Sequence, residues 1–258
     1  MRAVVFALAL VGCARQEAPP EAGVTIEYIA HASFKITSSG GHSVLIDPFA
    51  SQVWIGYDWP AGVEADAILI THPHYDHDGG EYRGMPVPWS DGARVMREPG
   101  RHEIGDITVE GIEGKHADPY GKEFGQRNTI FVIEVDGLRI AHLGDNRPLT
   151  DANVAALGRI DVLMSPADAV DHILPTPIIN AMISRIRPRW LVPMHYRLPD
   201  LETGPDKPED LGSIDPWLEG RQNIVRLDAS RTVLTANARE GEMEYLIFRH
   251  SPLVRRPE

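Results

Sequence analysis

The sequence predicts one α/β domain, and three observations support this prediction. The chain has 258 residues, of which 43% are hydrophobic and 24% charged, which is ordinary for a globular protein with a sizeable core. Short runs of β-branched and apolar residues fill its first half, whereas helical spacing comes later. No change in composition within residues 24–258 is sharp enough to mark a second domain.

Strands are expected where β-branched and apolar runs are bounded by Gly, Asp or Pro. In the first half of the chain these runs are 24–29, 33–37, 43–46, 67–71, 107–112, 129–135 and 138–143. Gly40-Gly41 and Asp136-Gly137 separate neighbouring runs and are typical of hairpin turns. Further strands are expected at 190–192, 224–227, 232–235 and 243–248.

Two helices are expected between the later strands. Thr150 is a good N-cap for a short helix that runs to Leu157. Thr176 followed by Pro177 is typical of an N-cap with proline at the first helical position. Apolar residues then recur at helical spacing until Pro188, which ends the pattern.

The charge of the chain is strongly acidic and unevenly distributed. Lys and Arg number 25 against 37 Asp and Glu, a net charge of −12. Nucleic acid is therefore not an expected partner, because phosphate binding needs clustered Lys and Arg. Residues 200–219 hold seven carboxylates and one Lys. This segment predicts a loop with a short helix around Trp217, which either overhangs the functional site or is a solvated surface loop.

The first residues resemble a bacterial lipoprotein signal. Arg2 precedes nine apolar residues, too few to cross a hydrocarbon layer of about 30 Å as a helix. Leu10-Val11-Gly12-Cys13 resembles the lipobox, which implies a signal peptide at 1–12, lipid attachment at Cys13 and a tether at 13–23. The protein is then expected to be anchored to the membrane in the bacterial cell envelope, facing the periplasm. The alternative is an N-terminal strand with a buried cysteine.

The densest chemical pattern lies in residues 68–80, where a buried-strand run ends in His72, His74, Asp76 and His77. Strand ends at a sheet edge are where α/β proteins place their sites. Imidazole with carboxylate suits zinc, manganese or iron. Four donors this close cannot all face one metal ion without strain, so they favour two adjacent ions. The alternative is a polar loop that is only rich in histidine.

This motif is the His-X-His-X-Asp-His signature of the metallo-β-lactamase superfamily, which the chain resembles from Val24 to Tyr196. The family's other ligands have counterparts after later strand runs, at His116, Asp145 and His195. The resemblance implies the four-layer αββα sandwich of the metallo-β-lactamase fold over residues 24–258. It also implies that His72, His74 and His116 hold the first metal ion, that Asp76, His77 and His195 hold the second, and that Asp145 bridges them.

Two upstream segments resemble one branch of the superfamily, the ascorbate-6-phosphate lactonase-like and N-acylphosphatidylethanolamine phospholipase-like proteins. These segments are 28–34, with Ala30 in place of the usual Gly, and 45–48. Within them, Asp47 is expected to accept the free N–H of a metal-binding histidine. His31 is expected to support a ligand, to face the substrate or to serve only as a hydrogen-bonded structural residue.

Two residues outside these motifs are candidates for the substrate site. His172 lies on a loop before the second predicted helix, near the rim of the site in this family. Tyr196 follows a predicted ligand and either donates a proton to the leaving group or only packs. His142, three residues before Asp145, is expected to be a strand residue or to support a ligand.

The resemblance implies a hydrolase for a small-molecule substrate. Two divalent metal ions, zinc first and manganese or iron as alternatives, would activate a hydroxide to cleave an ester, lactone or phosphodiester. Asp76 and Asp145 would be catalytic residues as well as ligands. A true β-lactamase is disfavoured, because the best-known subclasses place a Cys on the second metal and this chain has no Cys beyond residue 13.

Two other functions stay open on the sequence. The first is a membrane-anchored metal-binding protein of this fold without hydrolytic activity. The second is an enzyme that acts on lipids at the membrane to which Cys13 would anchor it.

Overall fold

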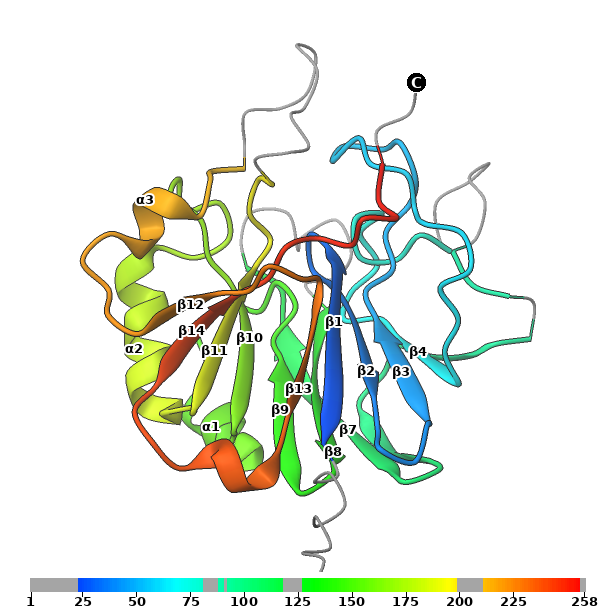
Figure 1. The fold of residues 1–258 in the computed structure, drawn as a ribbon, viewed down its shortest axis with the longest axis horizontal. Coiled ribbons are helices and arrows are strands. Elements are labelled where there is room, and N and C mark those ends of the chain that lie inside the picture. Colours follow the sequence, from blue (N-terminus) through cyan, green and yellow to red (C-terminus); the bar gives the residue numbers. More distant parts are fainter. Residues whose placement is uncertain (1–22, 81–87, 91, 118–126, 199–210, 256–258) are drawn as a thin grey trace, which may run out of the picture.

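The computed structural model describes residues 23–80, 88–90, 92–117, 127–198 and 211–255. Two β-sheets pack around a common apolar core, and the described α-helices lie beside the larger sheet (Figure 1). This α/β sandwich confirms the predicted fold class. The signal peptide, Cys13 and nearly all of the tether lie outside the described residues, and the first strand begins at Val24.

The smaller sheet has six strands in the described part of the chain, in the order β13-β1-β2-β3-β4-β5. They are β1 (Val24–Ala30), β2 (Ser33–Thr37), β3 (Ser43–Ile46), β4 (Ala67–Leu69), β5 (Arg94–Met96) and β13 (Arg231–Leu234). β2 is antiparallel to β1 and β3, whereas β3, β4 and β5 are parallel neighbours. The carboxyl ends of β1, β3 and β4 therefore point to the same edge.

The larger sheet has eight described strands in the order β12-β14-β11-β10-β9-β8-β7-β6. They are β6 (Gly100–Ile104), β7 (Ile107–Lys115), β8 (Arg127–Val135), β9 (Leu138–His142), β10 (Val162–Pro166), β11 (Trp190–Met194), β12 (Ile224–Arg226) and β14 (Glu244–Ile247). β9, β10 and β11 are parallel, and β8 is antiparallel to both β9 and β7. The carboxyl ends of β7, β9, β10 and β11 thus also share one edge.

The core comes largely from strands whose residues are nearly all apolar and buried. Every residue of β3, β10 and β11 is buried, as expected for strands covered on both faces. Phe34 of β2 and Phe131 of β8 are both fully buried in the apolar cluster. This packing holds the strand ends rigidly, which a metal centre built on them requires.

Three strands, β5, β6 and β10, were not predicted, and β5 and β6 lie at the edges of the two sheets. β5 is only three residues long, and β6 carries charged side chains at Arg101 and Glu103 that break the apolar pattern. β6 nevertheless pairs with β7 over its whole length. An edge strand tolerates charged residues because one of its sides faces solvent, and pairing with a strong neighbour then decides its conformation.

The helices are α1 (Asp151–Leu157), α2 (Thr176–Ile186), α3 (Asp215–Leu218) and the 3₁₀-helix η2 (Ala236–Arg239). Thr150 caps α1 as predicted and forms a capping box with Asn153. The prediction that Thr176 is the N-cap of α2 is wrong, because α2 begins at Thr176 and Pro175 is the N-cap. The Thr176 hydroxyl instead donates to Asp171 Oδ1 at 2.9 Å. The short helix expected around Trp217 is α3.

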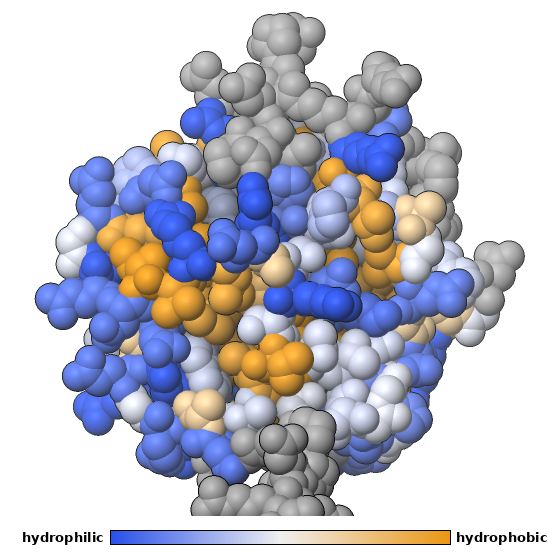
Figure 2. Space-filling view, in the orientation of Figure 1, coloured by the Kyte–Doolittle hydropathy of each residue, from blue (hydrophilic) through white to orange (hydrophobic). Residues whose placement is uncertain are grey.

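The surface shows apolar side chains in separate patches. The exposed large apolar residues in the described ranges are Val170, Val225, Val233 and Leu253. Figure 2 shows the apolar groups of one face interrupted by polar side chains. Scattered groups of this kind are normal at protein surfaces and do not by themselves require a partner. None of the helices that the structure describes has the length and hydropathy of a membrane span.

Candidate metal centre

The seven predicted ligands lie just after the carboxyl ends of strands, where the two sheets meet. His72, His74, Asp76 and His77 occupy the loop after β4, and His116 follows β7 directly. Asp145 and His195 follow β9 and β11. Six of these side chains are buried and His74 is half-buried. The shared edge of parallel strands thus gathers residues that are up to 123 positions apart, counted as 195 minus 72.

His72, His74 and His116 form the first potential metal-binding group. One ring nitrogen from each lies within 4.8 Å of the others. His72 Nε2 is 3.1 Å from His74 Nδ1. Three imidazoles that converge in this way provide the nitrogen ligands that zinc and related divalent ions prefer.

Asp76, His77 and His195 form a second group beside the first. The Nε2 atoms of His77 and His195 each lie 3.5 Å from Asp76 Oδ2. His31 also belongs to this cluster, because its Nε2 is 3.0 Å from the same carboxylate oxygen. Of the three roles that the sequence leaves open for His31, which are to support a ligand, to face the substrate or to serve as a structural residue, this hydrogen bond fits the support of Asp76.

Asp145 lies between the two groups. Its Oδ2 atom is 3.8 Å from His72 Nε2 and 3.6 Å from His116 Nε2 on one side. The same oxygen is 3.4 Å from His77 Nε2 and 3.2 Å from His195 Nε2 on the other. One carboxylate oxygen therefore faces four imidazoles, which is the placement that a bridging ligand requires.

Several of the polar atoms that face this centre make no hydrogen bond within the described residues. Buried atoms without a partner include Nε2 of His77, His116 and His195 and Oδ1 of Asp145. A buried polar atom without a partner is costly and is rare in folded proteins. Four such atoms in one cluster fit metal ions, because coordination would satisfy all of them at once.

Asp47 orients two of the histidines, as the sequence predicted for one. His77 donates from Nδ1 to Asp47 Oδ2 at 2.8 Å, which leaves Nε2 free to face Asp145. The Thr71 hydroxyl donates to the same carboxylate at 2.8 Å. The Thr71 oxygen can then accept from His72 Nδ1, 3.0 Å away, so that Nε2 of His72 also keeps its lone pair.

His116 is oriented by the backbone instead of by a carboxylate. Its Nδ1 donates to the Ala117 carbonyl oxygen at 2.5 Å, which again leaves Nε2 toward the centre. The backbone N–H of Ala117 in turn donates to the carbonyl of Asp145. This hydrogen bond links the end of β7, which is followed by His116, to the segment after β9 that carries Asp145.

The pKa values of the cluster follow from burial and mutual charge. Burial lowers the pKa of His74 to about 4 and also places the pKa of His72 well below its ordinary value. Both rings are therefore neutral at physiological pH and can act as ligands. Burial opposes ionisation of Asp76 and Asp145 too, but the surrounding histidines outweigh it and hold both carboxyl pKa values well below normal.

His77 and His195 behave in the opposite way. Burial would lower the pKa of each ring, but the neighbouring carboxylates outweigh burial, and Asp145 contributes most. The pKa of His195 rises to about 9, and that of His77 also lies well above its ordinary value. A metal ion that binds these rings would displace the protons that the neighbouring carboxylates stabilise on them.

The remaining candidates lie at different distances from the centre. The ring of His172 stacks on that of His195 with centroids 5.4 Å apart, so His172 lies beside the second group, and its contact with a substrate stays a prediction. Tyr196 is buried beside Tyr28, and burial raises its pKa well above its ordinary value. Its hydroxyl is therefore protonated at physiological pH, and its burial beside Tyr28 is consistent with packing. His142 is a buried strand residue whose Nε2 donates to the Ala32 carbonyl.

The acidic segment 200–219 is described only from residue 211. Its described end attaches to the loop after β10, because Gly212 N donates to Asp168 Oδ2 at 2.8 Å. Ala169 N also donates to the Ser213 carbonyl. The end of the segment therefore lies beside the loop that carries His172, and the rest falls outside the described residues.

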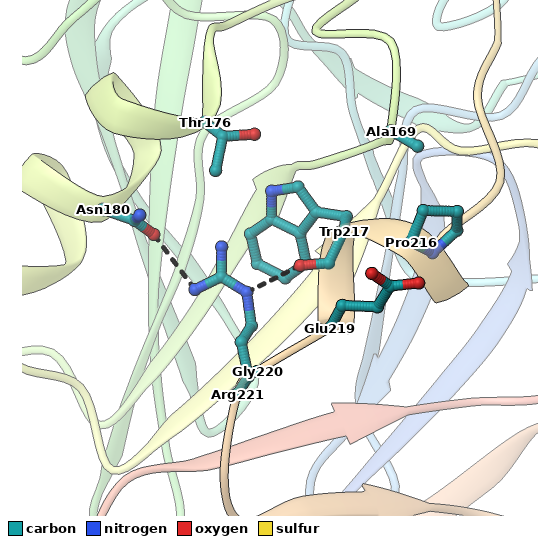
Figure 3. A pocket seen from close by; sticks show the side chains of 8 residues that line it. All are labelled: Ala169, Thr176, Asn180, Pro216, Trp217, Glu219, Gly220 and Arg221. Atoms are coloured by element: carbon teal, nitrogen blue, oxygen red, sulfur yellow. Dashed lines mark hydrogen bonds between the residues drawn. The ribbon is translucent and has the colours of Figure 1, made fainter.

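A cavity of about 450 Å³ opens between α2 and α3, away from the ligands (Figure 3). Asn180 of α2 and Trp217 of α3 line it, and the Arg221 guanidinium lies 3.6 Å from the centre of the Trp217 ring. None of the seven predicted ligands is among the residues that line this cavity. Arg221 already donates to Asn180 Oδ1 and to the Trp217 carbonyl, so its main contacts are internal.

Two sheets whose parallel strands end in one cluster of His and Asp define a protein of the metallo-β-lactamase class. Residues 25–195 match the family described as the beta-lactamase superfamily domain. The match covers well over half of the chain, and the protein belongs to this family. The narrower branch that residues 28–34 and 45–48 resemble stays a prediction.

Several relatives share most of the chain. A protein from Thermococcus onnurineus named UPF0173 metal-dependent hydrolase is 29% identical over 207 residues, which are 71% of this chain and 90% of that protein. A protein of the same name from Rubrobacter xylanophilus is 28% identical over 203 residues, covering 67% of this chain and 82% of its own length.

Solved structures have the same fold. A metallo-β-lactamase superfamily protein from Thermotoga maritima superposes with a TM-score of 0.63 at 22% identity, covering 88% of this chain and 100% of its own. A metallo hydrolase from Ignicoccus hospitalis has a TM-score of 0.50 at 21% identity and covers 71% of this chain and 88% of its own.

Proposed function

We propose that this protein is a hydrolase that uses two divalent metal ions to cleave an ester, lactone or phosphodiester bond in a small molecule. The observation that carries the proposal is the position of Asp145 Oδ2, within 3.8 Å of four imidazole Nε2 atoms that belong to two ligand groups. The names of the relatives from Thermococcus and Rubrobacter support a metal-dependent hydrolase. Zinc suits the donor set best, and manganese or iron are alternatives.

The predicted ligands would have the following roles. His72, His74 and His116 would hold one ion, Asp76, His77 and His195 the other, and Asp145 both. When bound, the ions would supply Lewis acidity and lower the pKa of a coordinated water toward neutrality. Asp76 and Asp145 would act as catalytic residues by fixing the position of the reacting groups.

Burial of the centre matters for this chemistry. Except for His74, the ligand side chains are almost wholly shielded from solvent, which strengthens electrostatic interactions at the centre. His74 is half-buried, so we expect the substrate to approach from its side. His31, bonded to Asp76 at 3.0 Å, would keep that carboxylate oriented while the substrate binds.

The test is metal content and turnover on the same preparations. The full chain, loaded with zinc, manganese or iron, is assayed on a panel of aryl esters, lactones and phosphodiesters. His74→Ala and Asp145→Ala are expected to lose bound metal and hydrolysis together. His42→Ala is the matched control, because His42 is an exposed histidine that is also paired with an aspartate, Asp106.

The outcomes separate the proposal from its rival. Turnover that depends on metal and on Asp145 supports the hydrolase. Two bound metal ions without turnover on any member of the panel would favour a metal-binding protein that lacks hydrolytic activity. Turnover that persists in metal-free protein would refute the metal-dependent mechanism.

We also propose that Cys13 carries a lipid that anchors the protein to the membrane of the bacterial envelope, facing the periplasm. The lipobox resemblance at Leu10-Val11-Gly12-Cys13 supports this proposal. Incorporation of labelled palmitate into the wild-type protein and its loss in Cys13→Ala would support the anchor. If the substrate is a membrane lipid, Cys13→Ala is also expected to hydrolyse lipid in vesicles more slowly than the wild-type protein. Wild-type protein that incorporates no labelled palmitate would refute the anchor.

A further inference from the structure

Two aromatic residues from separate loops pack over the second ligand group. Trp54 lies in the connection between β3 and β4, and His172 lies between β10 and α2. Their rings stack with centroids 5.4 Å apart and an interplanar angle of 26°. His172 in turn stacks on His195 at 5.4 Å and 20°, and Trp54 meets His31 edge-on at 6.0 Å.

Accessibility distinguishes these two rings from the ones beneath them. His31 and His195 are 1% and 2% exposed, whereas Trp54 and His172 are half-buried. Trp54 and His172 therefore present aromatic surface to solvent directly above the second group. We call this pair the Trp54–His172 wall.

Backbone hydrogen bonds brace the loop that carries Trp54. Gln52 N donates to the Tyr57 carbonyl at 2.7 Å, and Gly56 N donates to the Val53 carbonyl at 2.6 Å, which closes a tight turn around Trp54. A ring held in place before binding loses little conformational entropy when a ligand packs on it.

The loop that carries His172 is fixed by a buried carboxylate. Asp168 is 4% exposed, and its Oδ1 accepts from the backbone N–H of His172 at 3.0 Å. Its oxygens also accept from the N–H groups of Val170 and Gly212. Since three backbone donors occupy Asp168, its charge is satisfied internally, and the carboxylate serves to hold the loop that carries His172.

We propose that the Trp54–His172 wall is a substrate-binding subsite for a flat, uncharged apolar group, such as an aryl group, that the substrate carries next to the scissile bond. This inference rests on the proposed function. The faces of Trp and His rings attract flat apolar groups through burial and offset stacking. The wall stands over the His195 side of the centre, so it would select substrates by the group that extends to that side.

Binding of two phosphonates to the zinc-loaded full chain tests the subsite without relying on turnover. Methylphosphonate carries only the anionic head that the metal centre would bind, and benzylphosphonate adds one aryl group. Isothermal titration calorimetry is expected to show tighter binding of benzylphosphonate to the wild-type protein. Trp54→Leu is expected to weaken benzylphosphonate about 10-fold and methylphosphonate less than about 2-fold, on the scale of one aromatic contact.

A matched control exists in the same connection. Trp59 is also half-buried, but its ring packs edge-on against Phe49 at 5.0 Å, and no described ring contact joins it to a ligand. Trp59→Leu is expected to leave both affinities within about 2-fold of wild type. His172→Ala is expected to weaken benzylphosphonate about 3- to 10-fold, because one of the two rings remains.

The outcomes distinguish this inference from the function on which it rests. Equal affinity of the wild-type protein for the two phosphonates would overturn the subsite while leaving the metal centre intact. Trp54→Leu that weakens both phosphonates equally, or neither, would overturn it as well. A wild-type chain that binds none of zinc, manganese or iron would overturn the proposed function itself, and the subsite with it.

Discussion

Asp47→Asn is the most informative substitution outside the ligand set. Asp47 is fully buried and accepts hydrogen bonds from His77 Nδ1, Thr71 Oγ1 and Thr71 N, each at 2.8 Å. Asparagine has nearly the same shape, and it tolerates the positive φ of 47° at this position. The backbone is therefore not expected to change, and the substitution removes the charge that orients His77.

The expected effect is on metal affinity more than on folding. Loss of a residue that orients a metal-binding histidine typically weakens affinity about 10- to 100-fold, or about 1.4–2.7 kcal/mol. Because His77 donates a hydrogen bond directly to Asp47, the affinity for the second zinc ion should fall by this amount. The first ion should weaken less than about 10-fold, because His72 is linked to Asp47 only through Thr71.

Zinc affinity is measured by competition with a chelator of known affinity, with the zinc content of each fraction determined by mass spectrometry. Asp106→Asn is the control, because Asp106 also accepts from a histidine, His42, but at an exposed site. The assigned role of Asp47 would be refuted if Asp47→Asn left the affinity for the second zinc ion unchanged. It would also be refuted if the affinity for the first ion fell more than that for the second.

Three further predictions concern other parts of the structure. Arg97→Leu removes a bidentate pair to the fully buried Asp78 in the ligand loop. It is expected to lower the free energy of unfolding, measured by urea denaturation, by about 3 kcal/mol. A loss below about 1 kcal/mol would contradict this prediction. Thr150→Ala removes the capping box of α1 and should lower the free energy of unfolding by about 1 kcal/mol. Thr176→Ala removes one exposed hydrogen bond and should lower it by less than half of that. The reverse order in the same assay would show that the caps are wrongly assigned. The pKa of His195 is about 9, so at pH 8 this ring is mostly protonated before zinc binds; calorimetry in buffers of different ionisation enthalpy should detect proton release at pH 8 that declines above pH 9, and zinc binding without proton release would contradict the charge assignment.

The ligand cluster could be predicted from the sequence because its residues resemble the ordered motif of the superfamily and each of them follows an apolar strand run. Parallel strands that end at one edge bring such residues together regardless of their separation in the chain. The resemblance of residues 45–48 to one branch of the superfamily located Asp47, which directly follows β3. The loop before α2 places His172 against His195, next to the predicted ligands.

Other features could not be predicted, because tertiary contacts decide them. Trp54 lies in a loop without a motif, and only its packing against His172 marks it as part of the site. Asp168 gains its role from backbone N–H groups that the chain brings to it from residue 212. Thr176 has the residue type of an N-cap, but the nearby Asp171 carboxylate engages its hydroxyl and its N–H.

The central claim is that one carboxylate, Asp145, joins two metal sites. Anomalous diffraction from crystals of the zinc-loaded protein tests it most directly. The expected result is two peaks about 3.5–4 Å apart, one beside His72, His74 and His116 and the other beside Asp76, His77 and His195, with Asp145 between them. A single peak, or two peaks that do not share Asp145, would contradict the account.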